Sequence, residues 1–303
     1  MINPTFSILI TTKNRKAELA LTLKNISYLL DRDDVECILC DDGSNDGTYD
    51  FVKSNYPNIQ VLRNAISKGL IYSRNKLFEK TIAKYAISLD DDLHFITEHP
   101  LELIDSFFKK YPSCAVMSFR IFWSLDSPTS TEHNLETERV KSFAGGANVW
   151  RMKDWKETPK YPDWFIFYGE EEYASLNLFK INKHIYFFPD ILCHHRVSIK
   201  ERKMKHDNLI RERRLLRAGW YLYLMFYPLK LIPRKFAYSV WMQLKLKVFK
   251  GNLGMLIAIF QASFDVIINL PKLLKNSNRL SLQEFREYCK LPNVRLYWTP
   301  VNS

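Results

Sequence analysis

Cysteine is scarce in this sequence, and the few cysteines present argue against a structural zinc site and against a disulfide framework. The 303 residues contain 5 cysteines, an odd number. Cys37 and Cys40 form a C-x-x-C, but no second pair is present that would complete a zinc site. On a strand, positions i and i+3 also point to opposite faces. We therefore expect reduced cysteines that serve as small apolar fillers in a cytosolic protein.

Long uncharged runs are missing as well. The apolar segment Phe6–Ile10 is too short for the core of a signal peptide, and no basic segment precedes it. The longest uncharged stretch, from Gly251 to Phe264, ends at Asp265 and falls short of the roughly 20 residues that span a bilayer. We expect neither a secretory leader nor a membrane-spanning helix, and no internal repeat or low-complexity segment is visible.

Acidic residues become rare toward the end of the chain. The residues before His195 include 23 basic and 27 acidic side chains, whereas 21 basic and only 6 acidic ones follow from there on. The net charge of +11 therefore comes from the last third of the chain. Such asymmetry indicates two parts with different tasks.

Strand-like and helix-like segments alternate in the first part of the chain, which predicts an α/β fold. Alternation of this kind is typical of a mostly parallel, Rossmann-like sheet with helices on both faces. The expected strands are Phe6–Ile10, Val35–Cys40, Ile59–Leu62 and Tyr85–Leu89, and apolar residues at helical spacing lie between them, in 19–30, 46–55 and 70–82.

Acidic and hydroxyl side chains follow three of these strands where each strand ends. Thr11-Thr12, Asp41-Asp42 and Asp90-Asp91-Asp92 all occupy such positions. In open α/β sheets, ligands bind beyond the carboxyl ends of the strands. Adjacent carboxylates repel each other, so a positive group should lie among them. A Mg²⁺ or Mn²⁺ ion carrying a diphosphate suits such hard oxygen ligands.

The middle of the chain is less regular. It predicts strands at Ala115–Phe122, Phe143–Arg151 and Ile185–Leu192, and a helix at Glu171–Lys180. The second of these strands contains Gly145-Gly146-Ala147, and paired glycines in a strand often allow a ligand or another backbone to come close.

Four motifs together resemble family 2 glycosyltransferases. They are Thr11–Arg15, Asp41–Thr48, Asp90–Asp92 and Gly169–Glu172, in the order seen in that family. The resemblance covers Phe6 to His195 and implies a GT-A fold, an inverting mechanism and a nucleotide-diphosphate sugar donor.

The resemblance also implies roles for individual residues. Thr11 and Asp42 would contact a uracil or thymine base, with Asp41 beside them. Asp92 would bind the metal, Mg²⁺ or Mn²⁺, and His194 would join it there. The remaining residues expected at the nucleotide sugar are Thr12, Asn14, Arg15, Arg74, Asp90 and Asp91.

The general base implied by the resemblance is Glu171, which would deprotonate the attacking hydroxyl. Glu170 and Glu172 flank it, and their like charge would raise its pKa. The sequence leaves open which of the three glutamates is the base. It also leaves open whether His194 or His195 contacts the metal.

Two other classes of protein remain as alternatives. A nucleotidyltransferase of sugar phosphates also uses metal-binding carboxylates, but it usually has a Gly-rich loop after the first strand, and Thr11–Lys16 contains no glycine. A non-enzymatic nucleic-acid- or membrane-binding protein would explain the charge but not the acidic strand ends. No nucleic-acid-binding module accompanies the charge, and we expect no nucleic-acid partner.

The last third of the chain predicts amphipathic helices. Lys200–Lys205 and Arg211–Arg217 are strongly basic, and apolar stripes follow at helical spacing within 236–248 and 253–267. Such helices lie in the membrane interface, where anionic headgroups attract Lys and Arg. A plain helical packing subdomain is the alternative interpretation of this region. We divide the chain into 1–112, nucleotide-sugar binding; 113–203, acceptor binding and catalysis; and 204–303, peripheral membrane association.

By resemblance, the acceptor is a polyprenyl-linked glycan. The expected reaction moves a sugar from a UDP- or dTDP-sugar to that glycan, at the cytoplasmic face of the membrane, in bacterial surface polysaccharide synthesis.

Overall fold

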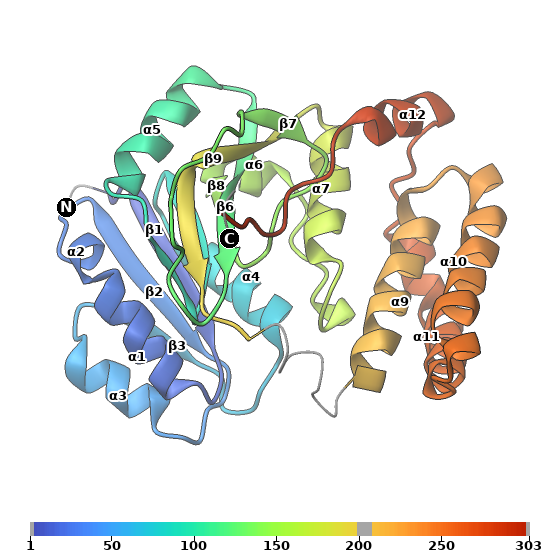
Figure 1. Ribbon diagram of the computed structural model, residues 1–303, viewed down its shortest axis with the longest axis horizontal. Helices are drawn as coiled ribbons and strands as arrows, with labels where there is room; N and C mark the ends of the chain where they lie inside the picture. The colour runs from blue at the N-terminus through green and yellow to red at the C-terminus, as the bar shows by residue number, and fades with distance from the viewer. Residues whose placement is uncertain (1–2, 199–207, 301–303) are drawn as a thin grey trace.

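The computed structural model describes residues 3–198 and 208–300 (Figure 1). Within them one curled sheet has the strand order β3-β2-β1-β4-β8-β6-β9-β5, and β7 pairs with β9. The first four strands are β1 (Phe6–Thr12), β2 (Val35–Asp41), β3 (Gln60–Arg63) and β4 (Tyr85–Asp90). They are parallel, as predicted, so their carboxyl ends meet at one edge.

The sheet is mixed beyond β4. The further strands are β5 (Leu93–Phe95), β6 (Cys114–Trp123), β7 (Glu138–Val140), β8 (Ala147–Arg151) and β9 (His184–His195). β6 and β9 are parallel, whereas β8 is antiparallel to both β4 and β6, and β5 and β7 are antiparallel to β9. The α/β fold is confirmed, but the mostly parallel sheet holds only for β1–β4. Antiparallel strands such as β5, β7 and β8 need no helical crossover.

Helices cover both faces of the sheet (Figure 1). On one face lie α1 (Lys16–Asn25), α2 (Ser27–Leu30), α3 (Thr48–Asn55) and α5 (Pro100–Lys110), which share a core with Ile8 and Ile10 of β1. On the other lie α4 (Leu70–Lys80), α6 (Met152–Glu157) and α7 (Glu170–Lys180), which share a core with Leu9. The alternation along β1 separates these two cores because successive strand side chains point to opposite faces.

The last third of the chain forms a helical unit. Its elements are α9 (Asn208–Phe226), η2 (Leu229–Leu231), α10 (Ile232–Leu246), η3 (Val248–Lys250), α11 (Gly254–Lys275) and α12 (Leu282–Lys290). α9 packs against α11 on one side and α7 on the other. Met225 and Phe226 of α9 and Tyr288 of α12 belong to the same core as α7. The predicted boundary at residue 204 and the basic Lys200–Lys205 lie outside the described residues.

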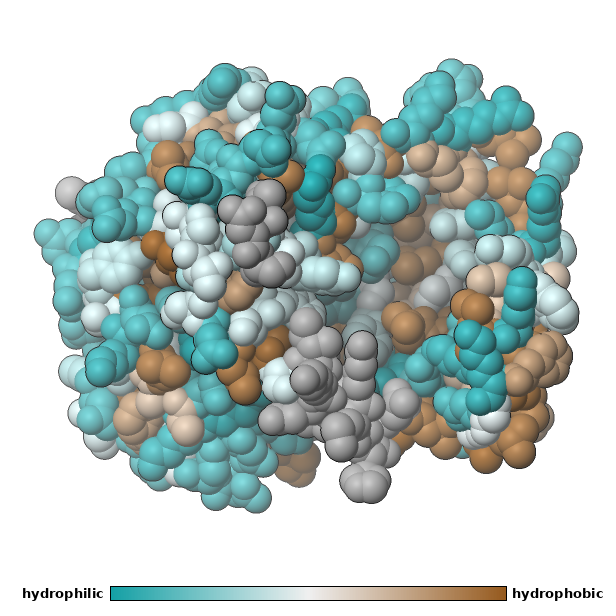
Figure 2. Space-filling model, in the orientation of Figure 1, coloured by the Kyte–Doolittle hydropathy of each residue, from teal (hydrophilic) through white to brown (hydrophobic). Residues whose placement is uncertain are grey.

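Large apolar side chains are exposed on the helical unit, and apolar residues gather over its lower part in Figure 2. Phe260, the most exposed of them, retains 75% of its accessible surface. The others include Tyr238, Trp241, Phe249, Leu253, Ile257, Phe264, Ile267 and Ile268. The helices of this unit are therefore amphipathic, as predicted, but their buried side chains also pack into the core that includes α7.

The structure differs from the sequence expectation at α11. By length and composition alone, Gly254–Lys275 is apolar enough to cross a membrane, with a mean hydropathy of 1.5 over its most apolar window. A single helix of this kind is weak evidence for a membrane span. The expectation ended the apolar run at Asp265, but this side chain faces α9, where Arg213 forms two hydrogen bonds to it, of 2.8 and 2.6 Å.

We predict that Phe226→Ala lowers the free energy of unfolding by about 3–5 kcal/mol, because it opens a cavity where α9 meets α7. Phe226 is fully buried, and its ring centroid lies 5.5 Å from that of Tyr173. The control Phe260→Ala removes an exposed ring and should change stability by less than about 0.5 kcal/mol. Urea denaturation measures both. Equal values would contradict the shared core.

Candidate active site

A cleft of about 1500 Å³ opens at the carboxyl ends of β1 and β4. The register of the sheet brings the predicted residues there, because Thr11 pairs with Asp90 and Thr12 with Asp41. All but two of the predicted site residues line this cleft: Thr11, Thr12, Asn14, Arg15, Asp42, Arg74, Asp90, Asp91, Asp92 and Glu171. The exceptions are Asp41 and His194. Separate acidic strand ends thus meet in one cavity.

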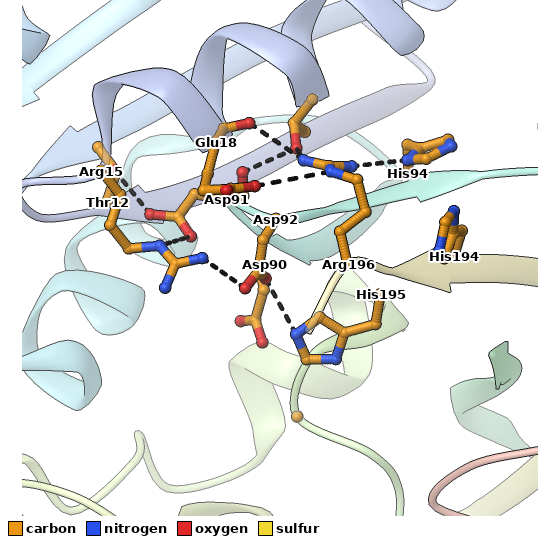
Figure 3. Close-up of polar contacts among 12 residues, drawn as sticks. Thr12, Arg15, Glu18, Asp90, Asp91, Asp92, His94, His194, His195 and Arg196 are labelled. Atoms are coloured by element: carbon orange, nitrogen blue, oxygen red, sulfur yellow. Dashed lines mark hydrogen bonds and ion pairs between the residues drawn. The ribbon is translucent and has the colours of Figure 1, made fainter. Parts of the chain in front are cut away.

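Asp90, Asp92 and His195 form a group that could hold a metal ion (Figure 3). One ligand atom from each lies within 4.8 Å of the others. Asp92 Oδ1 is 3.0 Å from His195 Nε2. Burial acts to raise the pKa of Asp92, but the hydrogen bond from His195 and the charge of Arg15 bring its pKa below the usual value. The carboxylate is therefore ionised and available as a ligand.

The donor set of this group fits a divalent cation. Carboxylate oxygens suit Mg²⁺ and Mn²⁺, and an imidazole nitrogen suits transition metals. Two carboxylates and one imidazole are few enough ligands to leave coordination positions for a substrate phosphate, as Mg²⁺ sites usually do. Asp90, Asp92 and His195 are thus the residues that would hold the ion.

His194 lies on the other face of β9 and corrects one sequence assignment. Its Nε2 is 3.0 Å from the carbonyl oxygen of Ser124, and its ring packs against Phe122 and His94. Adjacent strand residues point to opposite faces, so only one of the two histidines can face the cleft. That residue is His195, and His194, assigned to the metal from the sequence, is turned away from it.

Asp91 belongs to the walls of the site rather than to the metal-binding group. Thr12 Oγ1 donates a 2.7 Å hydrogen bond to its Oδ2, and Arg15 Nε lies 2.9 Å from its Oδ1. Burial raises the pKa of Asp91 to about 7, although Arg15 and Thr12 oppose the shift. Arg15 also reaches Asp92, with an Nη2–Oδ2 distance of 2.5 Å. A single guanidinium therefore balances two adjacent carboxylates.

Arg74 connects the metal-binding group to the glutamates of α7. Its side chain is buried and lies 3.0 Å from Asp90 and 3.0 Å from Glu170. It also donates a 2.9 Å hydrogen bond to the carbonyl oxygen of Gly145. The sequence expectation placed Arg74 near the nucleotide, and in the structure it lies among the carboxylates of the cleft.

Glu171 reaches into the cleft beside Arg74, at 3.9 Å, and keeps 21% of its side-chain exposure. Burial in the cleft and the charges of Glu170 and Glu172 raise its pKa well above the usual value, while Arg74 opposes the shift. Of its neighbours, Glu170 is buried against Arg74 and Glu172 is exposed. The pKa of Glu172 is raised as well, but Glu172 does not line the cleft. Glu171 is therefore the glutamate that combines a raised pKa with an accessible carboxylate in the cleft.

The predicted glycine pair makes room for these carboxylates. A Cβ atom on Gly146 would lie 2.9 Å from Asp90 Oδ2, and one on Gly145 would collide with the carboxylate of Glu171. Both glycines lie in the turn before β8, so the observed strand begins later than the predicted Phe143. The close approach is to side chains of the site, so a larger residue at either position would displace one of these carboxylates.

Asp42, expected at the nucleobase, lines the cleft and accepts four hydrogen bonds from the loop before α4. Asn64 Nδ2 and the amide of Lys68 donate hydrogen bonds of 2.7 and 2.8 Å to its Oδ1. Ser67 Oγ and the amide of Gly69 donate bonds of 2.6 and 2.9 Å to its Oδ2. These bonds lower the pKa of Asp42 although burial opposes them. The carboxylate is fully engaged and organises the loop before α4.

The other residues expected at the nucleotide fall into two groups. Asp41 is fully buried and accepts a 2.9 Å bond from the amide of Ser44, so it shapes the turn after β2. Asn14 links that turn to β1, because its amide donates to Ser44 Oγ and its Oδ1 accepts from Asn45. Thr11 lines the cleft, and its Oγ1 has no partner among the described residues.

Sequence reasoning missed several lining residues. Arg196, directly after β9, donates bonds of 2.7 Å to Thr22 Oγ1 and 3.1 Å to the Glu18 carbonyl, and lies 2.7 Å from His94 Nδ1 (Figure 3). Its position beside His195 was the available signal. Ile166, Phe167 and Tyr168 also line the cleft, as do Arg211 and Arg214 of α9. Arg211 and Arg214 belong to the basic run noted in the sequence, but no local pattern places any of these five residues at the cleft.

The fold and this site define the class of protein. A parallel β1–β4 half-sheet, an Asp-rich group at its carboxyl edge and a glutamate-bearing helix facing the same cleft are the features of a GT-A glycosyltransferase. The match to a family model is consistent with this: residues 7–170, more than half of the chain, match the family described as Glycosyl transferase family 2. The chain belongs to this family.

Solved structures of glycosyltransferases share the fold. The mannosyltransferase PcManGT from Pyrobaculum calidifontis, with GDP-Man and Mn²⁺, has a TM-score of 0.55 at 13% identity, over 95% of this chain and 79% of that one. TarS from S. aureus has a TM-score of 0.53 at 17% identity, over 72% of this chain and 40% of that one. GalNAc-T7, with UDP, GalNAc and Mn²⁺, has a TM-score of 0.51 at 18% identity, over 63% of this chain and 43% of that one.

These alignments span less than half of GalNAc-T7 and of TarS. A comparison with curated proteins gives no match.

We predict that His195→Ala weakens Mn²⁺ binding at least about tenfold, because it removes a ligand of the metal-binding group, and changes to outer-shell partners alone cost about 10–100-fold. Electron paramagnetic resonance titration of free Mn²⁺ measures the affinity without any substrate. His194→Ala is the matched control and should bind Mn²⁺ like the wild type. A larger loss in His194→Ala than in His195→Ala would contradict the correction made above.

Proposed function

We propose that this glycosyltransferase moves a sugar from a UDP- or dTDP-sugar to a hydroxyl group of a glycan, with inversion at the anomeric carbon. One observation supports this most strongly. Glu171 and the Asp90–Asp92–His195 group face the same cleft, and Arg74 lies between them. A base and a cation-binding group on two sides of one cavity are what a single displacement requires.

The donor class is supported by ligands of proteins that share the fold. TarS residues 1–349 have been solved with UDP-GlcNAc, at a TM-score of 0.54 and 15% identity, and PcManGT with GDP-Man. Lys13, Lys16 and Lys68 also line the cleft, and their charge complements a diphosphate. The nucleotides named for these two proteins differ in their nucleobase. The choice of a UDP- or dTDP-sugar as donor is therefore based on the resemblance of the sequence motifs to the family.

The cation would be Mg²⁺ or Mn²⁺, held by Asp90, Asp92 and His195. When bound, it neutralises the negative charge that builds on the departing diphosphate. The histidine favours Mn²⁺, because imidazole is a better ligand for transition metals than for Mg²⁺.

The residues of the chain divide the remaining work. Glu171 takes the proton of the acceptor hydroxyl as its oxygen attacks the anomeric carbon, and the bond from that carbon to the diphosphate oxygen breaks. The raised pKa of Glu171 suits a base that works near neutral pH. Arg74 pairs with Glu170 and Asp90 at 3.0 Å and lies farther, at 3.9 Å, from Glu171, whose carboxylate stays available to the acceptor hydroxyl.

We predict that Glu171→Gln lowers turnover by about 10²–10⁴-fold while donor binding stays within about twofold, because only the proton acceptor is lost. The wild type should lose activity as the pH falls through the raised pKa of Glu171, since the base works unprotonated. This acidic limb should be absent from the residual activity of Glu171→Gln. Release of UDP or dTDP from a panel of donors, with a total bacterial lipid extract as acceptor, measures turnover.

Glu172→Gln is the matched control for this experiment. Glu172 is one residue further along α7 but exposed, so turnover should stay within about threefold of the wild type. Unchanged turnover in Glu171→Gln would remove Glu171 as the base. Release of pyrophosphate instead of UDP would favour the nucleotidyltransferase alternative, which the match to a glycosyltransferase family does not support.

We further propose that the helical unit docks the enzyme on the cytoplasmic face of the membrane, where a polyprenyl-linked glycan would be the acceptor. The exposed apolar side chains of α11 include Leu256, Ile257 and Phe260. The basic excess after His195 complements anionic headgroups, which contribute about 1 kcal/mol for each Lys or Arg near the surface. Arg211 and Arg214 place part of this charge at the rim of the cleft.

We predict that the double substitution Phe260→Ser and Ile267→Ser weakens binding to vesicles of phosphatidylcholine and phosphatidylglycerol by at least about tenfold, because each buried apolar side chain is worth about 1.5–3 kcal/mol. The matched control replaces Ile66 and Ile82, which are similarly exposed on the catalytic part, by serine. Co-sedimentation measures both. Equal binding of the two double variants would contradict docking through α11.

Deletion of the helical unit is a poorer test of membrane binding. α9 and α12 share a core with α7, so their removal would expose Tyr173 and unsettle the helix that carries Glu171. Surface substitutions leave that core intact.

A further inference from the structure

The segment between Pro162 and α7 contains a turn that its own sequence does not favour. Ile166 has φ 70° and ψ −51°, and the amide of Phe167 donates a 2.8 Å hydrogen bond to the carbonyl oxygen of Phe165. This is a γ-turn of the rare, strained type with positive φ at the central residue. A β-branched residue is an outlier there, so contacts from elsewhere must hold it.

This γ-turn forms a wall of the cleft next to the glutamates. Ile166, Phe167 and Tyr168 line the cleft, and Tyr168 and Gly169 also have positive φ, 72° and 88°. α7 begins one residue later, at Glu170. The conformation of the turn therefore sets where the first residues of α7, including Glu171, lie.

The γ-turn also contacts the loop before α4. A Cβ atom on Gly69 would lie 3.4 Å from the carbonyl oxygen of Ile166. The amide of Gly69 is one of the donors to Asp42. The turn thus crosses from the helix of the glutamates to the loop that Asp42 organises.

Arg217 of α9 holds the carbonyl on which this turn closes. Its Nη2 donates to the carbonyl oxygen of Phe165, the same oxygen that accepts the bond from Phe167. Arg217 is buried, and Tyr221, one turn further along α9, packs against the rings of Trp164 and Phe165 at 5.3 and 5.2 Å. A charged donor to a buried carbonyl is among the stronger hydrogen bonds.

Two further contacts fix α9 in this place. Asp265 of α11 lies 3.8 Å from Arg217 and forms a bidentate pair with Arg213. A Cβ atom on Gly169 would lie 3.0 Å from Cβ of Ala218, so α9 presses directly on the residue before α7. The helical unit is thus in contact with both ends of the γ-turn segment.

We propose that Arg217 is a positioning residue: by holding the Phe165 carbonyl, it fixes the Ile166 γ-turn as the acceptor-side wall of the cleft and so places Glu171. Asp265 in turn orients Arg217. This inference rests on the proposed function, in which Glu171 is the base. Phe167 and Tyr168 then present aromatic rings to the acceptor sugar beside Glu171.

Hydrogen exchange followed by mass spectrometry tests the structural part without any substrate. In Arg217→Ala the amides of residues 165–173 should exchange at least about tenfold faster than in the wild type, because a local opening is no longer opposed by Arg217. Arg217→Lys, which keeps one charged donor, should exchange at an intermediate rate. Asp265→Asn should also speed the exchange of these amides, but by less. If Arg217→Ala does not fold, Arg217→Lys and Asp265→Asn provide the test instead.

Arg279→Ala is the matched control. Arg279 Nη2 also donates to a backbone carbonyl, that of Leu224 in α9, at 2.8 Å and away from the γ-turn. Exchange of residues 165–173 should stay at the wild-type rate in this variant. Equal exchange in Arg217→Lys, Asp265→Asn and Arg279→Ala would overturn the proposal.

The kinetic arm separates positioning from general stability. Turnover in Arg217→Ala should fall about 10–100-fold, because a displacement of about 1 Å at a reacting group can cost about 10²-fold. The KM for the donor should stay within about twofold, and Arg217→Lys should recover most of the turnover. A rise in the donor KM with unchanged turnover would overturn the assignment to the acceptor side.

A double-mutant cycle with Ile166→Gly identifies the γ-turn as the coupled element. Glycine relieves the strain at positive φ, so Arg217→Ala should cost less turnover when combined with Ile166→Gly than it does alone. Equal losses would place the effect of Arg217 elsewhere. Absence of sugar transfer in the wild type would defeat the proposed function, and the exchange experiment would still decide the role of Arg217.

Discussion

The site depends on the balance between crowded carboxylates and two guanidinium groups. Asp90, Asp91, Asp92, Glu170 and Glu171 share one cleft, where like charges repel and burial penalises ionisation. Arg74 pairs with Asp90 and Glu170, and Arg15 pairs with Asp91 and Asp92. Burial and neighbouring charges give each carboxylate a different character. Asp92 is ionised, and burial raises the pKa of Asp91 to about 7 although Arg15 opposes that shift. Burial and the charges of Glu170 and Glu172 raise the pKa of Glu171, while Arg74 opposes the shift.

The helical unit packs against α7, the helix that carries Glu170 and Glu171, and against the segment before it. Arg217 and Ala218 meet the segment before α7, and Phe226 packs on Tyr173 one turn into it. The catalytic part therefore shares one core with α9, α11 and α12 of the helical unit. A unit with an exposed apolar face thus also contacts the segment that leads into the helix of Glu171.

The sequence predicted the features that follow from the order of strands and helices along the chain. The alternation of strands and helices placed Thr11, Asp42 and Asp90–Asp92 at one edge, because parallel strands leave no other arrangement. The sequence could not show which of His194 and His195 faces the cleft, because that depends on the register of β9. A shift of one residue in the register turns every side chain of the strand to the opposite face of the sheet. The motif predicted that Asp42 lies at the site, but not its four hydrogen bonds from the Asn64–Gly69 loop, because those partners are more than 20 residues away in the sequence. The contact of Arg217 with the γ-turn could not be predicted, since Arg217 and Phe165 are 52 residues apart and meet only through the packing of α9.

Asp265 shows how one residue can mislead a reading of the sequence and then explain the structure. In the sequence it interrupts an apolar run and leaves that run too short to span a bilayer. In the structure, Arg213 and Arg217 neutralise it on the α9 side, and α11 keeps its exposed apolar face on the other. A buried charge of this kind is costly without its partners, so α9 and α11 stay together. Asp265 of α11 pairs with Arg213 and Arg217 of α9, and Arg217 donates to the Phe165 carbonyl. A partner that covers the apolar face of α11 therefore acts on a helix that is joined through α9 to the wall of the cleft.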